Sequence, residues 1–208
     1  MQNDREPVAQ KKLSFIEEAR RGQIVDAAAA TVAELGYAQT SLARIADRAQ
    51  ISKGVITYHF ATKDEILRLV VTQFFEQGWE FMEGRILTQD TALGQLLAWI
   101  GAELEFFAAH RTGFLAMSDI VANHRGTDGS HAFGDEFAEE IQGLTDILLG
   151  GQQDGELRAF DARSVAQIIL RTVDGLLMSW ATDPTCDLAE QTPVLLDFIV
   201  HAIRAESS

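Results

Sequence analysis

The scarcity of proline is the feature that most restricts how this chain can fold. Only 3 of its 208 residues are prolines, whereas a protein made of many short strands uses proline freely in its turns. Because proline inside a helix breaks it, low proline content favours long helices. With 47% hydrophobic residues the chain can build a sizeable core. Its 1 cysteine, Cys186, excludes an internal disulfide.

Helix-start signals recur along the chain. Ser14 and Thr62 each stand three residues before a glutamate, the arrangement of a capping box. Ser52, Asp161 and Asp187 are further N-cap candidates. Helically spaced apolar residues follow these signals. We therefore predict an all-α fold of about nine helices, at 14–36, 42–49, 53–60, 63–86, 91–110, 113–124, 133–150, 161–182 and 187–205.

Three of these predictions rest on weak local signals. Gly36 is expected to end the first helix in the left-handed conformation. Gly150 and Gly151 are expected to end the seventh helix. The run Val55–Tyr58 is β-branched and aromatic, so a strand is the alternative there. We prefer a helix because N-cap residues flank the run closely and no alternating pattern leads into it.

Charge is distributed unevenly between the two parts of the chain. The net charge is −14 overall, about +1 for residues 1–68 and −15 for residues 69–208, and all four lysines lie in the first part. Such asymmetry is typical of a small polyanion-binding module joined to an acidic body, although an acidic solvated surface is the simpler explanation. No uninterrupted run of 18 apolar residues and no signal-peptide pattern occurs, which predicts a cytoplasmic protein.

Residues 42–60 have the spacing of a helix-turn-helix, in which the second helix enters the DNA major groove. On a helical wheel of 53–60, Ile56 and Phe60 share the face that would dock in the core. The outer face presents a cation, a backbone without a side chain and a phenol, from Lys53, Gly54 and Tyr58. The N-terminus of this helix, at Ser52, is suited to a phosphate.

The pattern QIVDAAAATVAELG at 23–36, with Thr40-Ser41 and ISKGVITYHFATKDEIL at 51–67, resembles the tetracycline-repressor (TetR) family of bacterial transcription regulators. The resemblance covers about residues 20–68. Residues 1–13 are polar, charged and without a period, which predicts a mobile arm. The resemblance implies a homodimer in which each chain has a helix-turn-helix domain (14–62) and a ligand-binding and dimerisation domain (63–208). It also implies a cytoplasmic repressor that binds palindromic operator DNA and is released by a small effector.

The resemblance assigns DNA contacts residue by residue. Ser41 and Arg44 would approach phosphate and the edge of the groove. The residues that would meet bases are Lys53, Gly54 and Val55 on the second helix. The assigned DNA-binding residues are Ser41, Arg44, Ser52, Lys53, Gly54, Val55, Thr57, Tyr58, His59 and Lys63. The chain departs from the family pattern twice, with Gln50 where glycine is usual and Thr57 where tyrosine is common. Thr57 keeps a hydroxyl, and Tyr58 could replace the missing phenol.

Aromatic residues and methionines are frequent in the acidic body, where each could simply pack in the core. Ligand sites in helical bundles form between helices and are mostly apolar with a few polar groups. We therefore expect a mainly apolar effector. Its predicted contacts are Trp79, Met82, Trp99, Glu103, Phe106, Met117, Asn123, Phe137 and Asp174, the last with a structural role as the alternative.

The last two predicted helices have wide apolar faces, as helices do when they pack on a partner as well as on their own domain. Burial within the same domain is the alternative. The predicted dimer interface consists of Leu176, Trp180, Leu195, Phe198, Ile199 and Ala202.

Two other classes of function stay open. A helical small-molecule-binding protein with weakened DNA binding would follow if Gln50 and Thr57 impaired the DNA contacts. A helical metal-dependent enzyme would have to use His110, His124, Asp128 and His131. These residues lack the spacing of a helical zinc pair, and no nucleophile or paired-carboxylate motif occurs. We therefore predict no enzyme activity, metal or cofactor.

Overall fold

The computed structural model describes residues 15–125 and 133–205, and these residues fold into nine α-helices and one 3-10 turn without a named strand. The elements are α1 (Phe15–Leu35), η1 (Tyr37–Gln39), α2 (Leu42–Ala49), α3 (Lys53–His59), α4 (Lys63–Leu87), α5 (Ala92–Ala109), α6 (Arg111–Asn123), α7 (Gly134–Gln153), α8 (Ala162–Thr182) and α9 (Leu188–Ile203). The predicted all-α fold is confirmed. The predicted arm at 1–13 lies outside the described residues.

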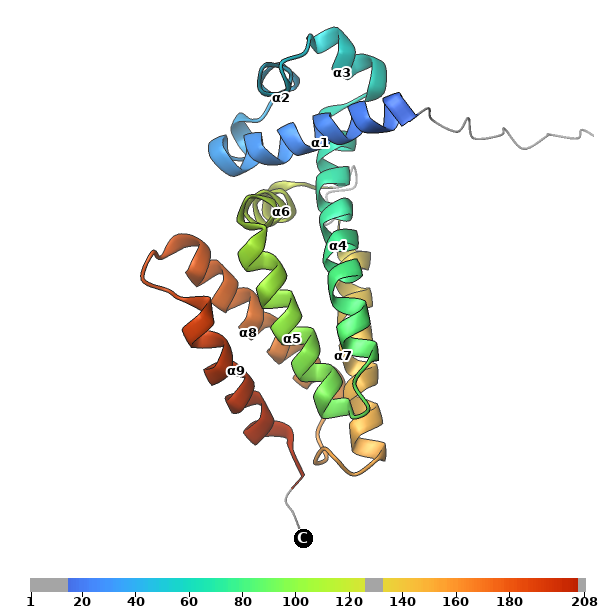
Figure 1. Cartoon of the computed structure of the whole chain (residues 1–208), viewed down its shortest axis with the longest axis vertical. Helices are drawn as coiled ribbons and strands as arrows, with labels where there is room; N and C mark the ends of the chain where they lie inside the picture. Colours follow the sequence, from blue (N-terminus) through green and yellow to red (C-terminus); the bar gives the residue numbers. More distant parts are fainter. Residues whose placement is uncertain (1–14, 126–132, 206–208) are drawn as a thin grey trace, which may run out of the picture.

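The molecule has two parts joined by one long helix (Figure 1). Helices α1, α2 and α3 form a small head at one end. Helices α5, α7, α8 and α9 form the body, and α4 runs from the head along the body. Helix α6 lies beside the head and packs against both α1 and α4. The head and body therefore share two helices rather than being joined by a flexible linker.

The predicted caps position the helices of the head. Ser41, Ser52 and Thr62 each accept a hydrogen bond from the backbone N–H three residues later. The capping box at Thr62 takes a variant form, because the Glu65 carboxylate accepts from the N–H of Ala61, at 2.9 Å. Asp161 caps α8 in the same way, whereas Asp187 caps α9 by accepting from the N–H of Ala189, two residues later.

The segment Val55–Tyr58 is helical, so the strand alternative is wrong. Ile56 and Phe60 are buried in the head, together with Ile24 and Ile45. In a strand Tyr58 would share the face of Ile56 and Phe60, but Tyr58 is 75% exposed, as helical spacing requires. The packing of the head therefore overrides the β-propensity of the segment.

Two turns in the head use positive φ angles. Gly36 has φ 83° and ψ 158°. The prediction of a positive φ is correct, but the extended ψ puts Gly36 outside the left-handed helical region. Gln50 occupies that region, with φ 54° and ψ 41°, at the end of α2. A side chain there costs about 1–2 kcal/mol relative to a right-handed residue, which explains why glycine is usual at this turn.

The predicted end of the seventh helix is wrong, because α7 continues through Gly150 and Gly151 to Gln153. A Cβ at Gly151 would lie 2.7 Å from the Leu157 side chain and 2.8 Å from Cβ of Ala92. Gly151 therefore permits close packing rather than a turn. The chain leaves the helix at Gly155, where φ is 75°. Helix α6 likewise begins at Arg111, two residues before the predicted start.

Helix α5 lies in the middle of the body, where it packs against α4, α7 and α9. Among the described helices it alone is long and apolar enough to cross a membrane by length and composition. Its side chains Leu96, Ile100 and Leu104 are buried in the protein core. A core helix of a helical body satisfies the same criterion, and the packing of α5 is that of a core helix.

Replacing Gln50 by glycine is expected to stabilise the protein, because glycine adopts the left-handed conformation without a Cβ clash. The expected gain is about 1 kcal/mol, which corresponds to a rise in melting temperature of roughly 2–4 °C for a chain of this size. Calorimetry would measure the change. The control Ala43→Gly, at an exposed right-handed position of α2, should lower stability by about 0.5–1 kcal/mol. A fall in melting temperature for Gln50→Gly would contradict the strain argument.

Candidate DNA-binding surface and ligand cavity

Helix α3 presents one face to solvent and docks the other in the head. Lys53, Gly54, Thr57 and Tyr58 are exposed, the last with 75% of its surface accessible. Val55 and His59 are partly buried. The Ser52 hydroxyl accepts from the N–H of Val55 at 3.3 Å, so it holds the start of the helix. The structure therefore brings the predicted base-contacting residues onto one accessible surface.

Thr57 and Tyr58 differ in what they offer to a partner. The Thr57 hydroxyl donates to the Gly54 carbonyl of its own helix at 3.1 Å. The phenol of Tyr58 lies in solvent, and its ring meets the His59 ring edge-on, with centroids 4.9 Å apart. Tyr58 is thus the side chain that presents a long-reaching hydroxyl on this surface, while the Thr57 hydroxyl is held close to its own backbone.

The other predicted DNA contacts lie around the α2 turn. Ser41 caps α2, and the Arg44 guanidinium donates to the backbone carbonyl of Gln39 at 3.0 Å. Lys63 differs from an ordinary surface lysine. Its ammonium donates to the Thr40 carbonyl at 3.2 Å and lies 4.6 Å from the centroid of the Tyr37 ring. Lys63 therefore ties the start of α4 to the turn before α2.

Sequence reasoning missed Arg21, which joins α1, α3 and α4. Its guanidinium donates to the backbone carbonyl of His59, lies 3.3 Å from the Glu65 carboxylate and stacks over the Phe60 ring at 4.0 Å. The available signal was its position four residues before the buried Val25, on the edge of the core-facing stripe of α1. Arg21 fixes the C-terminal end of α3 against the head.

A second missed cluster connects the head to α6. The Asp119 carboxylate accepts from the backbone N–H of Tyr37 at 2.6 Å. The Tyr37 hydroxyl lies 3.1 Å from Nδ1 of His124, whose ring is buried. Burial lowers the pKa of His124, although the nearby Asp64 carboxylate opposes this effect. The neutral imidazole of His124 is therefore favoured. We call the cluster of Tyr37, Asp119 and His124 the α6 junction.

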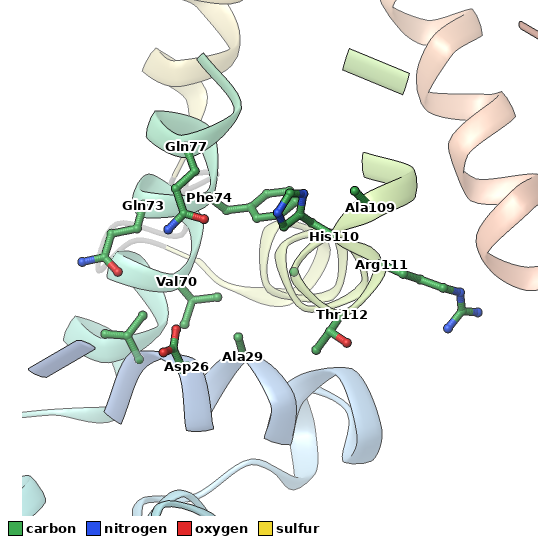
Figure 2. Close-up of a pocket in the computed structure, with 12 residues that line it drawn as sticks. Asp26, Ala29, Val70, Gln73, Phe74, Gln77, Ala109, His110, Arg111 and Thr112 are labelled. Atoms are coloured by element: carbon green, nitrogen blue, oxygen red, sulfur yellow. The ribbon is translucent and has the colours of Figure 1, made fainter. Parts of the chain in front are cut away.

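A groove of about 480 Å³ opens between α1, α4 and the start of α6. Figure 2 shows side chains from α1, α4 and the link between α5 and α6 around it, among them Asp26, Gln73, Gln77 and Arg111. Close packing closes its inner side, because a Cβ at Gly113 would lie 2.3 Å from the Phe74 ring. None of the predicted ligand contacts lines this groove.

A larger, partly open cavity of about 530 Å³ lies between α4, α5 and α7, and Glu76, Trp79 and Glu139 at its rim are exposed. Its size is typical of a small-molecule site. Among its lining residues are Phe75, Trp79, Met82, Trp99, Glu140 and Gly143. Trp79 and Trp99 meet edge-on with ring centroids 5.7 Å apart. We call this space the body cavity.

The structure places the nine predicted ligand contacts in different surroundings. Trp79, Met82 and Trp99 line the body cavity. Phe137 and Asp174 line a smaller neighbouring space, which shares Glu140 with the body cavity. Phe106 and Met117 are buried in the core, where Phe106 packs on Phe74 and Phe81. Asn123 is exposed and donates to Asp119.

Glu103 lies behind the body cavity rather than on its wall. It is buried, and its Oε2 atom has no hydrogen-bond partner among the described residues. Burial, followed by repulsion from Glu140 and Asp174, raises the pKa of Glu103 well above its usual value. Burial also raises the pKa of Glu140 to about 7. The sequence signal for Glu140 was a carboxylate on the apolar stripe of Phe137, Ile141 and Leu144.

The predicted dimer residues divide between the core and the surface. Leu195 and Ile199 are buried within the body, and Leu176, Trp180 and Ala202 are partly buried. Phe198 is 65% exposed. Other large apolar side chains on the surface of α8 and α9 are Ile168, Met178 and Val194. The exposed apolar surface of these helices thus centres on residues next to several of the predicted ones.

The histidines considered for a metal site have other surroundings. His110 Nδ1 lies 2.8 Å from the Phe106 carbonyl, and its ring stacks on Phe106. His124 belongs to the α6 junction, while Asp128 and His131 lie outside the described residues. Within 15–125 and 133–205, no three Asp, Glu, His or Cys residues are grouped so that they could hold a metal ion.

Comparisons with known proteins agree with this arrangement. A family model described as bacterial regulatory proteins of the tetR family matches residues 24–70, which include α2 and α3. The fatty acid metabolism regulator protein of Bacillus subtilis is 28% identical over 189 residues, covering 88% of this chain and 94% of its own. The A-factor receptor protein of Streptomyces griseus is 29% identical, covering 86% and 62%.

Solved structures resemble the whole fold. The fatty acid degradation regulator FadR from Bacillus halodurans has a TM-score of 0.79 at 20% identity, covering 94% of this chain and 100% of its own. The ketosteroid transcriptional regulator KstR2 of Mycobacterium tuberculosis has a TM-score of 0.74 at 23% identity, covering 90% and 96%. The likeness extends beyond the matched motif to the helical body.

Replacing Glu140 by glutamine is expected to stabilise the free protein at pH 7.5. A carboxyl whose folded pKa is raised favours folding at low pH, and this contribution is lost as pH rises from the unfolded value of 4.5 to about 7. Glutamine removes the burial cost of the charge, so the melting temperature at pH 7.5 should rise by roughly 2–4 °C or more. Differential scanning calorimetry at several pH values would measure it.

The gain should shrink as the pH falls toward 4.5, where the native glutamate is protonated. Glu139→Gln is the matched control, because Glu139 precedes Glu140 on α7 and is exposed; its effect should be within about ±0.5 kcal/mol. Equal melting temperatures for Glu140→Gln and the native protein at pH 7.5 would show that Glu140 is not penalised by burial.

Proposed function

We propose that this chain, which belongs to the tetR family of bacterial regulatory proteins, is a cytoplasmic repressor that binds a palindromic operator as a homodimer and releases it when a small effector binds. Its family membership makes it a DNA-binding transcriptional regulator. The observation that carries the proposal is the accessible face of α3, with Lys53, Gly54 and Tyr58 displayed together. The match of the family model to residues 24–70 confirms the resemblance predicted from residues 20–68.

DNA binding follows from how α3 is presented. The second helix of a helix-turn-helix enters the major groove, where side chains near its N-terminus reach base edges. Lys53 is the first residue of α3, and Gly54 leaves space for close approach. Arg44 is exposed on α2, from where it can reach the phosphate backbone. The Lys63 interactions suit it to position the turn around Thr40 and to add positive potential.

Dimerisation solves an electrostatic and a geometric difficulty. The body carries most of the negative charge of the chain, and DNA repels it. One recognition helix also reads only a few base pairs, whereas a two-fold dimer doubles the contacts. We assign the contact between subunits to the exposed apolar surface of α8 and α9, at Ile168, Met178, Val194 and Phe198. An apolar surface of this kind is a candidate interface.

Ligand control follows from the path of α4. Near its start, Lys63 bonds to the Thr40 carbonyl, and further along Phe75 and Trp79 line the body cavity. A ligand that displaces the cavity part of α4 therefore moves the head relative to the body. Release requires the ligand to bind the free conformation more tightly than the DNA-bound one. The α6 junction provides a second set of contacts with the head, through α6.

Replacing Lys53 by alanine is expected to weaken operator binding and to relax sequence preference. A lost base contact costs about 1–3 kcal/mol, or roughly 5- to 150-fold in affinity. Fluorescence anisotropy with promoter DNA from next to its own coding region, against random DNA of equal length, would measure both. Arg163→Ala is the control, because Arg163 is exposed on α8 in the body and its loss should leave the preference unchanged.

The same titration tests the proposed function. Saturable binding that favours the promoter fragment is the expected result. Binding of the native protein that never exceeds that to random DNA would reject the repressor and favour a helical ligand-binding protein without a regulatory DNA site.

Replacing Phe198 by glutamate is expected to produce monomers that no longer bind the operator tightly, because a charge at the centre of an apolar contact loses its hydration without gaining a partner. Light scattering should give a mass near twice 22.9 kDa for the native protein and near 22.9 kDa for the variant. Leu87→Glu, at an exposed leucine of α4, should leave the dimer intact. A native protein that scatters as a single chain would exclude this interface.

A further inference from the structure

The body cavity combines aromatic rings with carboxylates. Phe75, Trp79 and Trp99 provide the aromatic wall, and the charged residues that line the cavity are all glutamates: Glu76, Glu139 and Glu140. A purely apolar ligand needs no such charge. Aromatic faces and carboxylates together are the environment in which proteins bind organic cations.

A buried carboxyl group with one unpaired oxygen atom lies one helical turn beyond Trp99 on α5. Glu103 of α5 is 5% exposed, and its Oε2 atom accepts no hydrogen bond from the described residues. The groups that act on it are carboxylates from neighbouring helices, Glu140 of α7 and Asp174 of α8. The nearest positive charge in this cluster, Arg171, is exposed and pairs with Asp174 at 2.9 Å. The cluster therefore has an excess of acidic groups.

The cavity wall contains a second unpaired polar atom. Trp99 is 5% exposed and lines the cavity, and its indole Nε1 has no partner among the described residues. Unpaired polar atoms in a protein interior are uncommon, because each costs the hydration that it loses. Two of them lie one helical turn apart on α5, at Trp99 and Glu103, and of these the unpaired Glu103 oxygen is the one that a positive charge would stabilise.

We propose that the effector of the body cavity is a mainly apolar organic cation, with its positive charge against the Glu140–Glu103 carboxylates and its apolar part against the cavity side of the Trp79–Trp99 pair. The proposal rests on the regulatory function above and specifies its ligand class. A bare metal ion fits less well, because no three suitable ligands are grouped within the described residues. A neutral ligand leaves the excess of acidic groups unbalanced.

Proton release is a consequence of this arrangement. Burial raises the pKa of Glu103 well above its usual value and raises the pKa of Glu140 to about 7, so Glu140 is about half protonated near neutral pH. A bound cation favours the ionised carboxylates, so the pKa of Glu140 falls in the complex and its proton passes to the buffer. Affinity should therefore increase with pH, by about tenfold between pH 6 and 8.

Calorimetric titration of the full chain without DNA tests the proposal. The probes are trimethyl(2-naphthylmethyl)ammonium and 2-neopentylnaphthalene, in which a carbon atom replaces the charged nitrogen. We expect the ammonium ion to bind at least about tenfold more tightly at pH 8. Its binding enthalpy should depend on the ionisation enthalpy of the buffer, which reports the released proton, whereas that of the neutral probe should not.

Variants locate the charge. Glu140→Gln and Glu103→Gln should each lower affinity for the ammonium ion by about tenfold and leave affinity for the neutral probe unchanged. Glu105→Gln is the control, because Glu105 lies on the same helix but is exposed and pairs with Arg85 at 2.6 Å. Circular dichroism would verify that each variant is folded. Equal affinity for both probes, or a loss as large in Glu105→Gln, would overturn the proposal.

DNA binding is measured separately, so the two proposals fail independently. If the ammonium ion binds as described, its addition should weaken promoter binding of the native protein and have a smaller effect on Glu140→Gln. Cation binding that leaves promoter affinity unchanged would overturn its role as effector. A protein that never prefers promoter DNA would overturn the repressor function, while the calorimetric comparison would still decide whether the cavity selects a cation.

Discussion

The arrangement depends on one continuous helix that contributes buried side chains to both the head and the body. At its start, Ile66 and Leu67 of α4 are buried, and towards its end Ile86 is buried at the far end of the body. With 25 residues at about 1.5 Å each, α4 spans roughly 37 Å without a break. Since a helix resists bending more than a loop does, a shift at one end is transmitted to the other. A change in the body cavity that shifts α4 therefore also shifts the head.

Polar contacts then determine how the head follows that helix. The Asp119 carboxylate bonds to the backbone of Tyr37, and Lys63 bonds to the backbone of Thr40, so both ends of the η1 turn are attached, one to α6 and one to α4. Backbone contacts of this kind do not depend on the rotamer of a second side chain. They attach the turn before α2 to both α4 and α6, so these two helices act on it together.

The head could be predicted from the sequence because its structure is local. Ser41, Ser52 and Thr62 start helices through contacts three residues away, and Ile56 and Phe60 share a face by helical spacing alone. The body is different. Trp99 and Phe106 are seven residues apart and share one face of α5, so which of them meets a cavity depends on the side chains that α4 and α7 place opposite each, and periodicity does not reveal these. The same limit applies to Leu195 and Phe198, of which one is buried and one exposed. Gly151 misled for a related reason, since its need for glycine comes from Leu157 and Ala92 in another part of the fold.

Charge links the two parts of the molecule in opposite senses. The head must attract a polyanion. Its net charge is close to zero, but the positive charges of Lys53 and Arg44 lie on an accessible surface. The body is acidic and repels the same polyanion. Two of its acidic residues, Glu103 and Glu140, are buried, and the loss of hydration makes their ionised forms unfavourable when the cavity is empty. A ligand that restores the balance stabilises whichever conformation holds the cavity open. If the distance between the two heads in that conformation does not match the operator, the protein cannot bind the ligand tightly and the operator at the same time. The ligand then relieves the burial cost of the two carboxylates only when DNA is released.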